Sequence, residues 1–194
     1  GGEGPGGEGP GGEGPGGKPQ EPSVTPLVLY HGARCWSGPP RLVPAKQWKR
    51  VEHGPGLYLT TDRDGARGYA KGGGKVLRFE VESNLVLLEN KRISADDMIR
   101  FVESLPRLPG RKEILLDIER SVVRRGGDRQ LQAGLLLNLM VNRKVAHGDN
   151  GVALAIFYVE HGIDAAEVKH AGYTGQETWY VLFNLDKIVN YGPG

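Results

Sequence analysis

Apolar residues in the first part of the chain alternate with polar ones at the two-residue period of β-strands. Glycine, proline and charged residues, which favour turns, separate the apolar runs. This pattern predicts strands at residues 27–30, 57–61, 75–81 and 85–88. Between the second and third strands, Asp62 is a suitable N-cap for a short helix at 62–70.

From residue 95 the period of the apolar positions changes to that of amphipathic helices. It predicts helices at 95–105, 111–124, about 128–139 and 150–160. Two runs rich in β-forming residues follow, at 165–168 and 178–183, and 186–189 is expected to be a final short strand or turn. The order of strands, helical insert and strands is typical of an α+β domain.

The pattern divides the chain into a linker and a single domain. Residues 1–26 are mostly a repeat of Gly, Pro and Glu that offers nothing for a core, so we expect a disordered tether. Residues 27–194 are expected to form the domain, with its first and last strands in one mostly antiparallel sheet and a helical insert over about 95–161. The tether suggests that the chain is part of a longer polypeptide.

Charge and cysteine content limit the classes of partner. The chain has a formal net charge of +2, and residues 1–26 hold four Glu and one Lys, so the domain itself is more positive. This charge suits an anionic ligand or nucleic acid, although no clustered basic stripe is present. The single cysteine, Cys35, excludes an intramolecular disulfide and a Cys-rich zinc site. No apolar run reaches the ~18 residues of a membrane span, so we expect no membrane partner.

Several familiar motifs fail on spacing. The segment from Gly68 to Lys75 resembles a phosphate-binding loop, but no Ser or Thr follows the lysine. The five histidines lack metal-ligand spacing, so no metal is expected. Cys35 lies four residues after His31, which leaves a Cys–His nucleophilic pair conceivable, although a lone cysteine is more often inert.

Three segments remain, and together they resemble a known family. They are LVLYHGAR, GPGLYLTTDRDGARGYA and GQETWYVLFNLDKI, covering about residues 27–81 and 164–190. In order, they are similar to the catalytic domain of His-Tyr-Glu ADP-ribosyltransferases, the group that holds diphtheria toxin and the poly(ADP-ribose) polymerases. In that family one strand ends in His-Gly, a second carries a Tyr with another Tyr eleven residues on, and a late strand opens with the catalytic Glu. The matching residues here are His31, Gly32, Tyr58, Tyr69 and Glu177.

The resemblance implies a split, mostly antiparallel sheet and NAD as a co-substrate without a metal. It implies that Tyr58 and Tyr69 sandwich the nicotinamide ring, which suits aromatic stacking. Gly32 would pair with the carboxamide through its backbone, and His31 would bind ribose hydroxyls. Glu177 would bind the ribose 2′-hydroxyl and stabilise the oxocarbenium-like transition state, so the implied catalytic residues are Glu177, His31 and Tyr58.

One position departs from the family pattern. A small hydroxyl residue usually stands three positions before the second Tyr, and here that position is Ala66. The lost hydrogen bond is worth on the order of 1 kcal/mol, and Thr60 or Thr61 are candidates to replace it. Gln176 is a candidate contact for the acceptor. The loops at 33–56 and 169–176 are expected to select that acceptor, and the basic run 46–50 is either part of that contact or an ordinary solvated segment.

These observations predict an enzyme that transfers ADP-ribose from NAD to a macromolecular acceptor, protein or nucleic acid. The setting would be a bacterial toxin, a phage effector or a defence module acting in a reducing cytoplasm, where NAD is available. Alternatives are an NAD glycohydrolase, an RNA 2′-phosphotransferase, and an inactive structural or binding module held on the tether.

Overall fold

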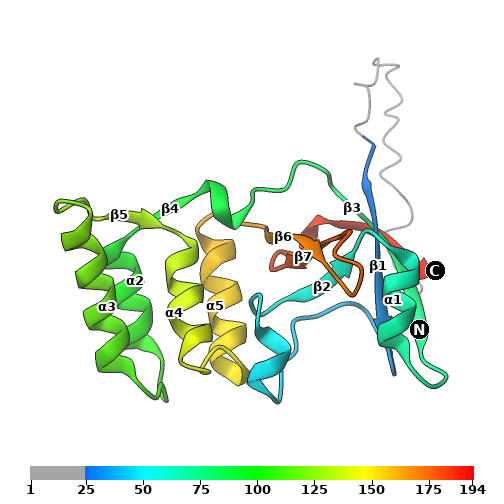
Figure 1. Ribbon diagram of the computed structural model, residues 1–194, viewed down its shortest axis with the longest axis horizontal. Helices are drawn as coiled ribbons and strands as arrows, with labels where there is room; N and C mark the ends of the chain where they lie inside the picture. Colours follow the sequence, from blue (N-terminus) through cyan, green and yellow to red (C-terminus); the bar gives the residue numbers. More distant parts are fainter. Residues whose placement is uncertain (1–24) are drawn as a thin grey trace, which may run out of the picture.

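The computed structural model describes residues 25–194, so nearly all of the predicted tether lies outside the described residues. The domain is mixed α+β, and its main sheet has six strands in the order β6-β7-β2-β1-β3-β8, with every neighbouring pair antiparallel (Figure 1). The strands are β1 (Leu27–Ala33), β2 (Leu57–Thr60), β3 (Lys75–Val81), β6 (Ala165–Ala171), β7 (Glu177–Leu182) and β8 (Ile188–Pro193). The expected mostly antiparallel sheet is therefore confirmed.

The sheet is weakly joined at its centre. β1 pairs with β3 along seven residues, whereas β1 and β2 share the single pair Tyr30 and Thr60. The sheet thus consists of two three-stranded halves, β6-β7-β2 and β1-β3-β8, that meet at one point. We call this junction between β1 and β2 the seam. Helix α1 (Arg63–Ala70) lies against β1, and the carboxylate of Asp62 caps it by accepting from the Asp64 N–H at 3.0 Å.

The helical unit, residues 92–160, forms the end of the molecule away from α1 (Figure 1). Its helices are α2 (Ala95–Ser104), α3 (Arg111–Arg124), α4 (Gly134–Asn142) and α5 (Gly148–Glu160). Two short strands, β4 (Arg92–Ser94) and β5 (Gln130–Gln132), pair beside them as a separate small sheet. The predicted helical insert is therefore present, with a two-stranded element inside it.

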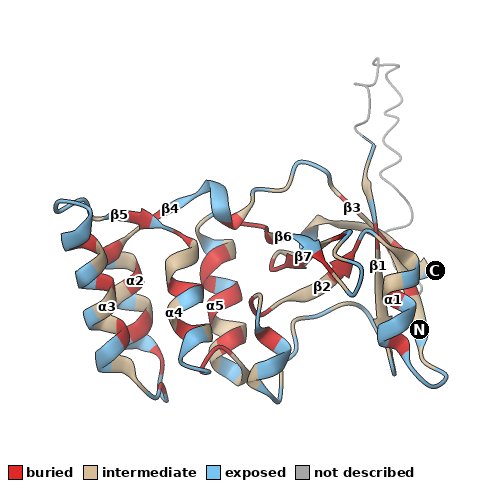
Figure 2. Cartoon of the chain, viewed as in Figure 1, coloured by how far each residue is buried: buried red, intermediate tan, exposed pale blue. Residues whose placement is uncertain are grey.

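The domain has two apolar cores, one large and one small. Figure 2 shows buried segments along the helices of the helical unit and in the main sheet. The large core fills the helical unit and reaches the main sheet through Val181 and Phe183. Within it, the buried hydroxyl of Tyr158 donates to the Ala133 carbonyl at 2.8 Å and accepts from the Leu137 N–H at 3.0 Å. The small core lies against β1, β2 and β3, around Leu29, Leu59 and Phe79.

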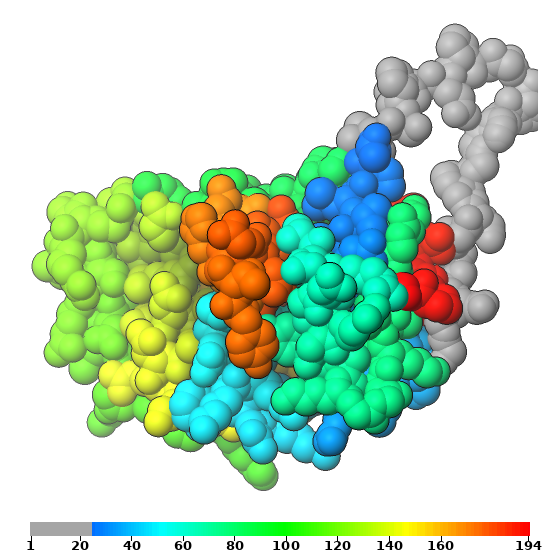
Figure 3. Space-filling model, turned by 45° about the vertical axis from the view of Figure 1, so that its right-hand side comes forward, coloured from blue at the N-terminus to red at the C-terminus, as the bar shows by residue number. Residues whose placement is uncertain are grey.

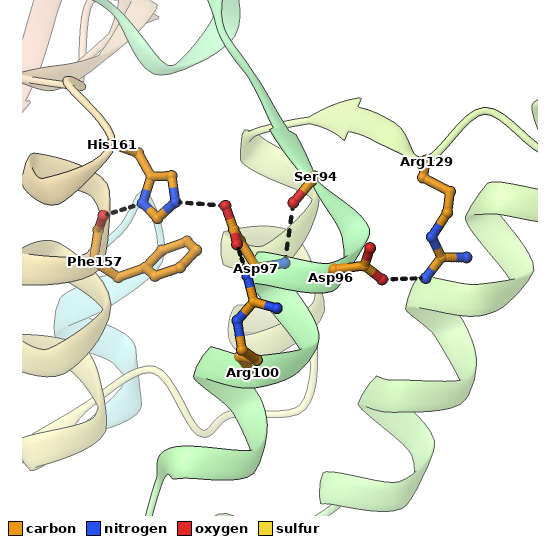
Figure 4. A network of polar contacts seen from close by, with 7 residues as sticks. All are labelled: Ser94, Asp96, Asp97, Arg100, Arg129, Phe157 and His161. Carbon is orange, nitrogen blue, oxygen red and sulfur yellow. Dashed lines mark hydrogen bonds and ion pairs between the residues drawn. The ribbon is translucent and has the colours of Figure 1, made fainter.

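A surface network ties the helical unit together (Figure 4). Ser94 caps α2 by accepting from the Asp97 N–H at 3.1 Å. The Asp97 carboxylate forms an ion pair with Arg100. The same carboxylate lies 3.2 Å from Nε2 of His161, which follows α5 directly. Arg129 bridges to Asp96 at 2.7 Å, and so links α2 to the strand that follows α3. These contacts join the first turn of α2 to the end of α5 and to the segment before β5.

Two predicted elements were wrong. No strand forms at 85–88, because Asp164 accepts from the Val86 N–H at 2.8 Å; that segment has a single bridge, from Leu87 to Ala165, before the short 3-10 helix Leu88–Asn90. No helix begins at residue 128. The Asp128 side chain instead accepts from the Gln130 N–H, β5 follows, and Leu131 is buried opposite Ile93. The last strand, β8, also runs further than expected.

Candidate functional site

The largest concentration of predicted site residues lies in a cavity at the seam, with a volume of about 410 Å³. Four of the five residues named by the resemblance line it: His31, Gly32, Tyr58 and Tyr69. β1 supplies the first two, β2 supplies Tyr58, and α1 supplies Tyr69. The rest of the wall is formed by Tyr30, Lys49, Arg50, Glu52, His53, Leu59, Thr60, Ala66 and Trp179. The weak pairing of β1 with β2 places this hollow at the middle of the sheet.

His31 is held in one orientation across the seam. Its Nδ1 lies 2.8 Å from the Tyr58 carbonyl oxygen, which can only accept, so Nδ1 carries the proton and donates. Burial lowers the pKa of His31, although the bond to the carbonyl opposes this shift. The neutral ring therefore keeps Nε2 as a hydrogen-bond acceptor. Trp36 packs edge-on at 5.4 Å between ring centroids and helps to fix the imidazole.

Both candidate tyrosines are neutral. Burial raises the pKa of Tyr58, and the nearby charge of Glu52 adds to the rise. Its hydroxyl donates to the Gly54 carbonyl at 2.7 Å and accepts from the His53 N–H at 3.1 Å. The pKa of Tyr69 is also raised, first by burial and then by the charge of Glu177. Each ring therefore offers an uncharged aromatic surface to the cavity.

The expected two-tyrosine clamp contains a third ring that the sequence reasoning missed. Trp179 lies edge-on to Tyr58, with centroids 6.2 Å apart, and edge-on to Tyr69 at 5.9 Å. The two tyrosines thus contact the same indole. Its signal in the sequence was the two-residue spacing from Glu177, which places both side chains on one face of β7.

Glu177 does not line the cavity but lies directly behind its wall. The residue is only 3% exposed, and its Oε1 accepts from the Thr60 hydroxyl at 2.6 Å and from the Trp179 indole N–H at 3.0 Å. Thr60 and Trp179 both line the cavity, so they separate the carboxylate from it. The sequence alone did not predict this burial.

Two glycines make room for the carboxylate. A Cβ at Gly172 would lie 1.9 Å from Oε2 of Glu177, and one at Gly65 would lie 2.5 Å from both carboxylate oxygens. Gly172 has a φ of +80°, a conformation that side chains disfavour. The loop between β6 and β7 therefore closes over Glu177. In Figure 3 this orange loop lies on the surface between the cyan segment near residue 50 and the blue-green α1.

Gly32 serves helix packing as well as the cavity. A Cβ at this position would fall 1.8 Å from the Ala66 carbonyl oxygen, so the space beside the glycine is filled by α1 and not left open for a ligand. Neither threonine offers the cavity a donor in place of the hydroxyl missing at Ala66. Thr60 donates to Glu177, and Thr61, whose hydroxyl accepts from the Thr178 N–H at 3.1 Å, does not line the cavity.

The remaining candidates lie at the edge of the site. Gln176 is exposed, in the loop just before β7. Cys35 is exposed beside a second cavity of about 290 Å³, and no hydrogen bond joins it to His31 in the part of the chain that the structure describes. This second cavity shares His31 and Arg50 with the first, so the two hollows meet at those side chains.

Within residues 25–194, no group of three or more His, Cys, Asp or Glu side chains is arranged to hold a metal ion. No helix in the same range is long and apolar enough to cross a bilayer.

Comparison of the chain with protein-family models, with curated proteins and with solved structures found no match.

Proposed function

We propose that this protein cleaves NAD at the bond between nicotinamide and ribose and transfers the ADP-ribose to a macromolecular acceptor. One observation carries the proposal. Four residues from three separate elements, His31, Gly32, Tyr58 and Tyr69, line one cavity, and the buried carboxylate of Glu177 stands behind its wall.

Cleavage of the bond between nicotinamide and ribose requires little proton transfer from the protein. The electron pair of the breaking bond leaves on nicotinamide, which departs neutral, so no general acid is needed. Positive charge develops on the ribose, and a fixed carboxylate in a site shielded from water stabilises such charge strongly. Glu177 supplies that carboxylate, and the neutral faces of Tyr58 and Tyr69 suit a flat cationic ring.

His31 has the right protonation for orienting the substrate. With the proton fixed on Nδ1 by the Tyr58 carbonyl, Nε2 accepts a hydrogen bond from a ribose hydroxyl. A charged imidazolium at this place would oppose the developing cation, and burial disfavours that form. The second cavity, on the other side of His31, gives room for the remainder of an extended dinucleotide.

Glu177 must reach the cavity for this reaction, and the loop above it supplies the means. Gly172 and Gly175 both have left-handed backbone conformations, with φ of +80° and +73°. We propose that NAD entry displaces this loop and turns the Trp179 indole, which exposes Oε2 of Glu177 to the 2′-hydroxyl. Before NAD binds, the loop covers Glu177 and shields its carboxylate from water.

The test is release of nicotinamide from NAD by the full chain, with Glu177→Gln beside it. The substitution removes the charge and keeps the shape, so we expect release to fall at least about 100-fold, the loss typical of one electrostatic catalytic group. The matched control is Glu167→Gln, because that carboxylate bonds the Tyr180 hydroxyl at 2.8 Å and does not line the cavity.

Equal release by the Glu177→Gln variant and the wild type would disprove the role of Glu177. If calorimetry detects no NAD binding and no nicotinamide appears, with or without cell lysate, the proposed function is wrong.

A further inference from the structure

We infer that the acceptor is a single-stranded nucleic acid, held at the mouth of the cavity by a tyrosine platform and two free cations. The role of this nucleic acid as an acceptor rests on the proposed function, whereas its binding to the protein does not depend on that function. The platform is Tyr69 with Tyr173, and the cations are Lys49 and Arg50.

The platform is an exposed aromatic surface beside the cavity. Tyr173 is 89% exposed, and its ring stacks on Tyr69 with centroids 6.4 Å apart and planes 19° from parallel. Packing explains Tyr69, which contacts Trp179, but it does not explain Tyr173, whose outer face is open to solvent. Every nucleic-acid base has a flat face that stacks on such a ring, whatever its sequence.

The cations stand on the wall of the same cavity. Lys49 and Arg50 are exposed, belong to the 3-10 helix Trp48–Val51, and form no ion pair with any of the residues 25–194. Lys49 and Lys144 lie over the Trp48 ring, with their ammonium nitrogens 5.7 Å and 4.5 Å from its centroid, which adds positive charge to this segment. Free cations next to an aromatic platform are the features that bind a phosphate backbone with unstacked bases.

The geometry favours a single strand. The bases of a duplex are stacked on each other and cannot present a face to Tyr173, and a concave cavity of about 410 Å³ has no room for a double helix. An acidic protein segment would pair with Lys49 and Arg50 but would leave the tyrosine platform unused. In the transfer step, the bond from ribose C1′ to nicotinamide breaks, a bond from C1′ to a nitrogen or oxygen of the strand forms, and the acceptor proton goes to solvent.

The first arm of the test measures binding without NAD. Fluorescence anisotropy of the full chain with a labelled oligonucleotide of about twelve residues, as single-stranded DNA, single-stranded RNA and duplex, gives the affinities. We expect single strands to bind more tightly than duplex. Tyr173→Ala should weaken binding at least about fivefold, and Tyr173→Trp should retain it, because a base still has a ring to stack on.

The second arm uses charge. Lys49→Glu with Arg50→Glu should weaken binding and reduce the dependence of log K on log salt by about 1.4 for the two lost contacts. The matched control is Lys112→Glu with Arg124→Glu on α3, which changes the same charge far from the cavity and should leave the salt slope unaltered. If Lys49 and Arg50 serve only the diphosphate of NAD, their reversal will change NAD affinity alone, and the inference falls.

The third arm follows label from the adenylate half of NAD. Label on the oligonucleotide, lost in Tyr173→Ala, supports the inference. Label on protein without oligonucleotide binding overturns it while sustaining the proposed function. Oligonucleotide binding with the expected variant pattern, but without nicotinamide release, overturns the proposed function and the acceptor role while sustaining the binding surface.

Discussion

The helical unit and the seam differ in the polar groups that they bury. The core of the helical unit is built from aliphatic and aromatic side chains, and its one deeply buried hydroxyl, on Tyr158, has both a donor and an acceptor partner. Within residues 25–194, the buried polar or charged residues are Thr60, Asp164 and Glu177, all outside the helices. Because burying an ion is costly, the presence of the buried Glu177 carboxylate at the seam requires a reason other than stability.

Asp164 and Glu177 sharpen this comparison, because both are buried carboxylates. Both oxygens of Asp164 accept hydrogen bonds, one from the Val86 N–H at 2.8 Å and one from the Asn184 side-chain amide at 3.0 Å. Asp164 therefore joins the segments that contain Val86 and Asn184. The hydrogen bonds to Glu177 converge on one oxygen, from two side chains that line the cavity. A carboxylate that holds structure is bonded on all sides, whereas one that is kept for chemistry leaves an oxygen for another partner.

The largest stability effect is expected in the helical unit. Leu154 is fully buried in the large core, so Leu154→Ala should lower the free energy of unfolding by about 2–5 kcal/mol. Urea denaturation measures this loss. Nicotinamide release per folded molecule should stay close to the wild-type value, because Leu154 does not line either seam cavity.

A large fall in release at a temperature where the Leu154→Ala variant is still folded would break the separation between the two regions. It would mean that the helical unit sets the geometry of the cavity.

A smaller effect separates the two carboxylates. Asp164→Asn puts an N–H against a donor, so it should cost about 1–3 kcal/mol of unfolding free energy. Glu177→Gln should change stability by less than about 1 kcal/mol, because an amide oxygen in the place of Oε1 accepts both existing bonds. Urea unfolding of the two variants at neutral pH gives both values.

If Glu177→Gln proves the more destabilising of the pair, Glu177 is a structural residue and the contrast with Asp164 is lost.

The smallest effect is a pH dependence in the helical unit. The hydrogen bond from His161, with help from the charge of Arg100, lowers the pKa of Asp97 below its usual value. A depressed folded-state pKa contributes stability above the unfolded pKa of about 4, and that contribution is lost as the pH falls further. Because the pair is partly exposed, we expect less than about 1 kcal/mol.

Urea unfolding between neutral pH and about pH 3 measures this slope, and Asp97→Asn should flatten it. Asp149→Asn, an exposed change in the first turn of α5, serves as the control and should leave the slope as it is. A wild-type slope unchanged by Asp97→Asn would place the acid-sensitive group elsewhere.

The sequence predicted most elements of the fold because their local signals were strong. The alternation in 75–81 and the helical period of apolar residues from residue 95 were sufficient to place β3 and α2. The segment 128–133 does not start a helix as predicted, because Leu131 is buried by pairing with a distant strand. No local pattern contains that contact. The same limit applies to 85–88, where a carboxylate 78 residues away takes the backbone N–H.

The cavity was predictable as a set of residues but not as a shape. The resemblance to the ADP-ribosyltransferases indicated His31, Gly32, Tyr58 and Tyr69, and these four residues line one cavity. Beyond the two-residue spacing of Glu177 and Trp179, no local pattern indicates that the indole contacts both tyrosines or that Gly65 and Gly172 enclose Glu177. Those facts depend on how β7 and α1 approach each other, and this is decided by packing across the whole sheet.

The single pair that joins β1 to β2 has a consequence for assembly of the domain. In the main sheet, β1, β3 and β8 belong to one half, and β2, β6 and β7 belong to the other, so the chain passes repeatedly from one half to the other. The loops between strands therefore connect two halves that share few backbone hydrogen bonds with each other. Pairs such as Leu57 with Leu182 form only after long loops close, so folding should be slow for this length. Neither half exists as a separate stretch of chain, and the hollow between them forms only when the whole domain is complete.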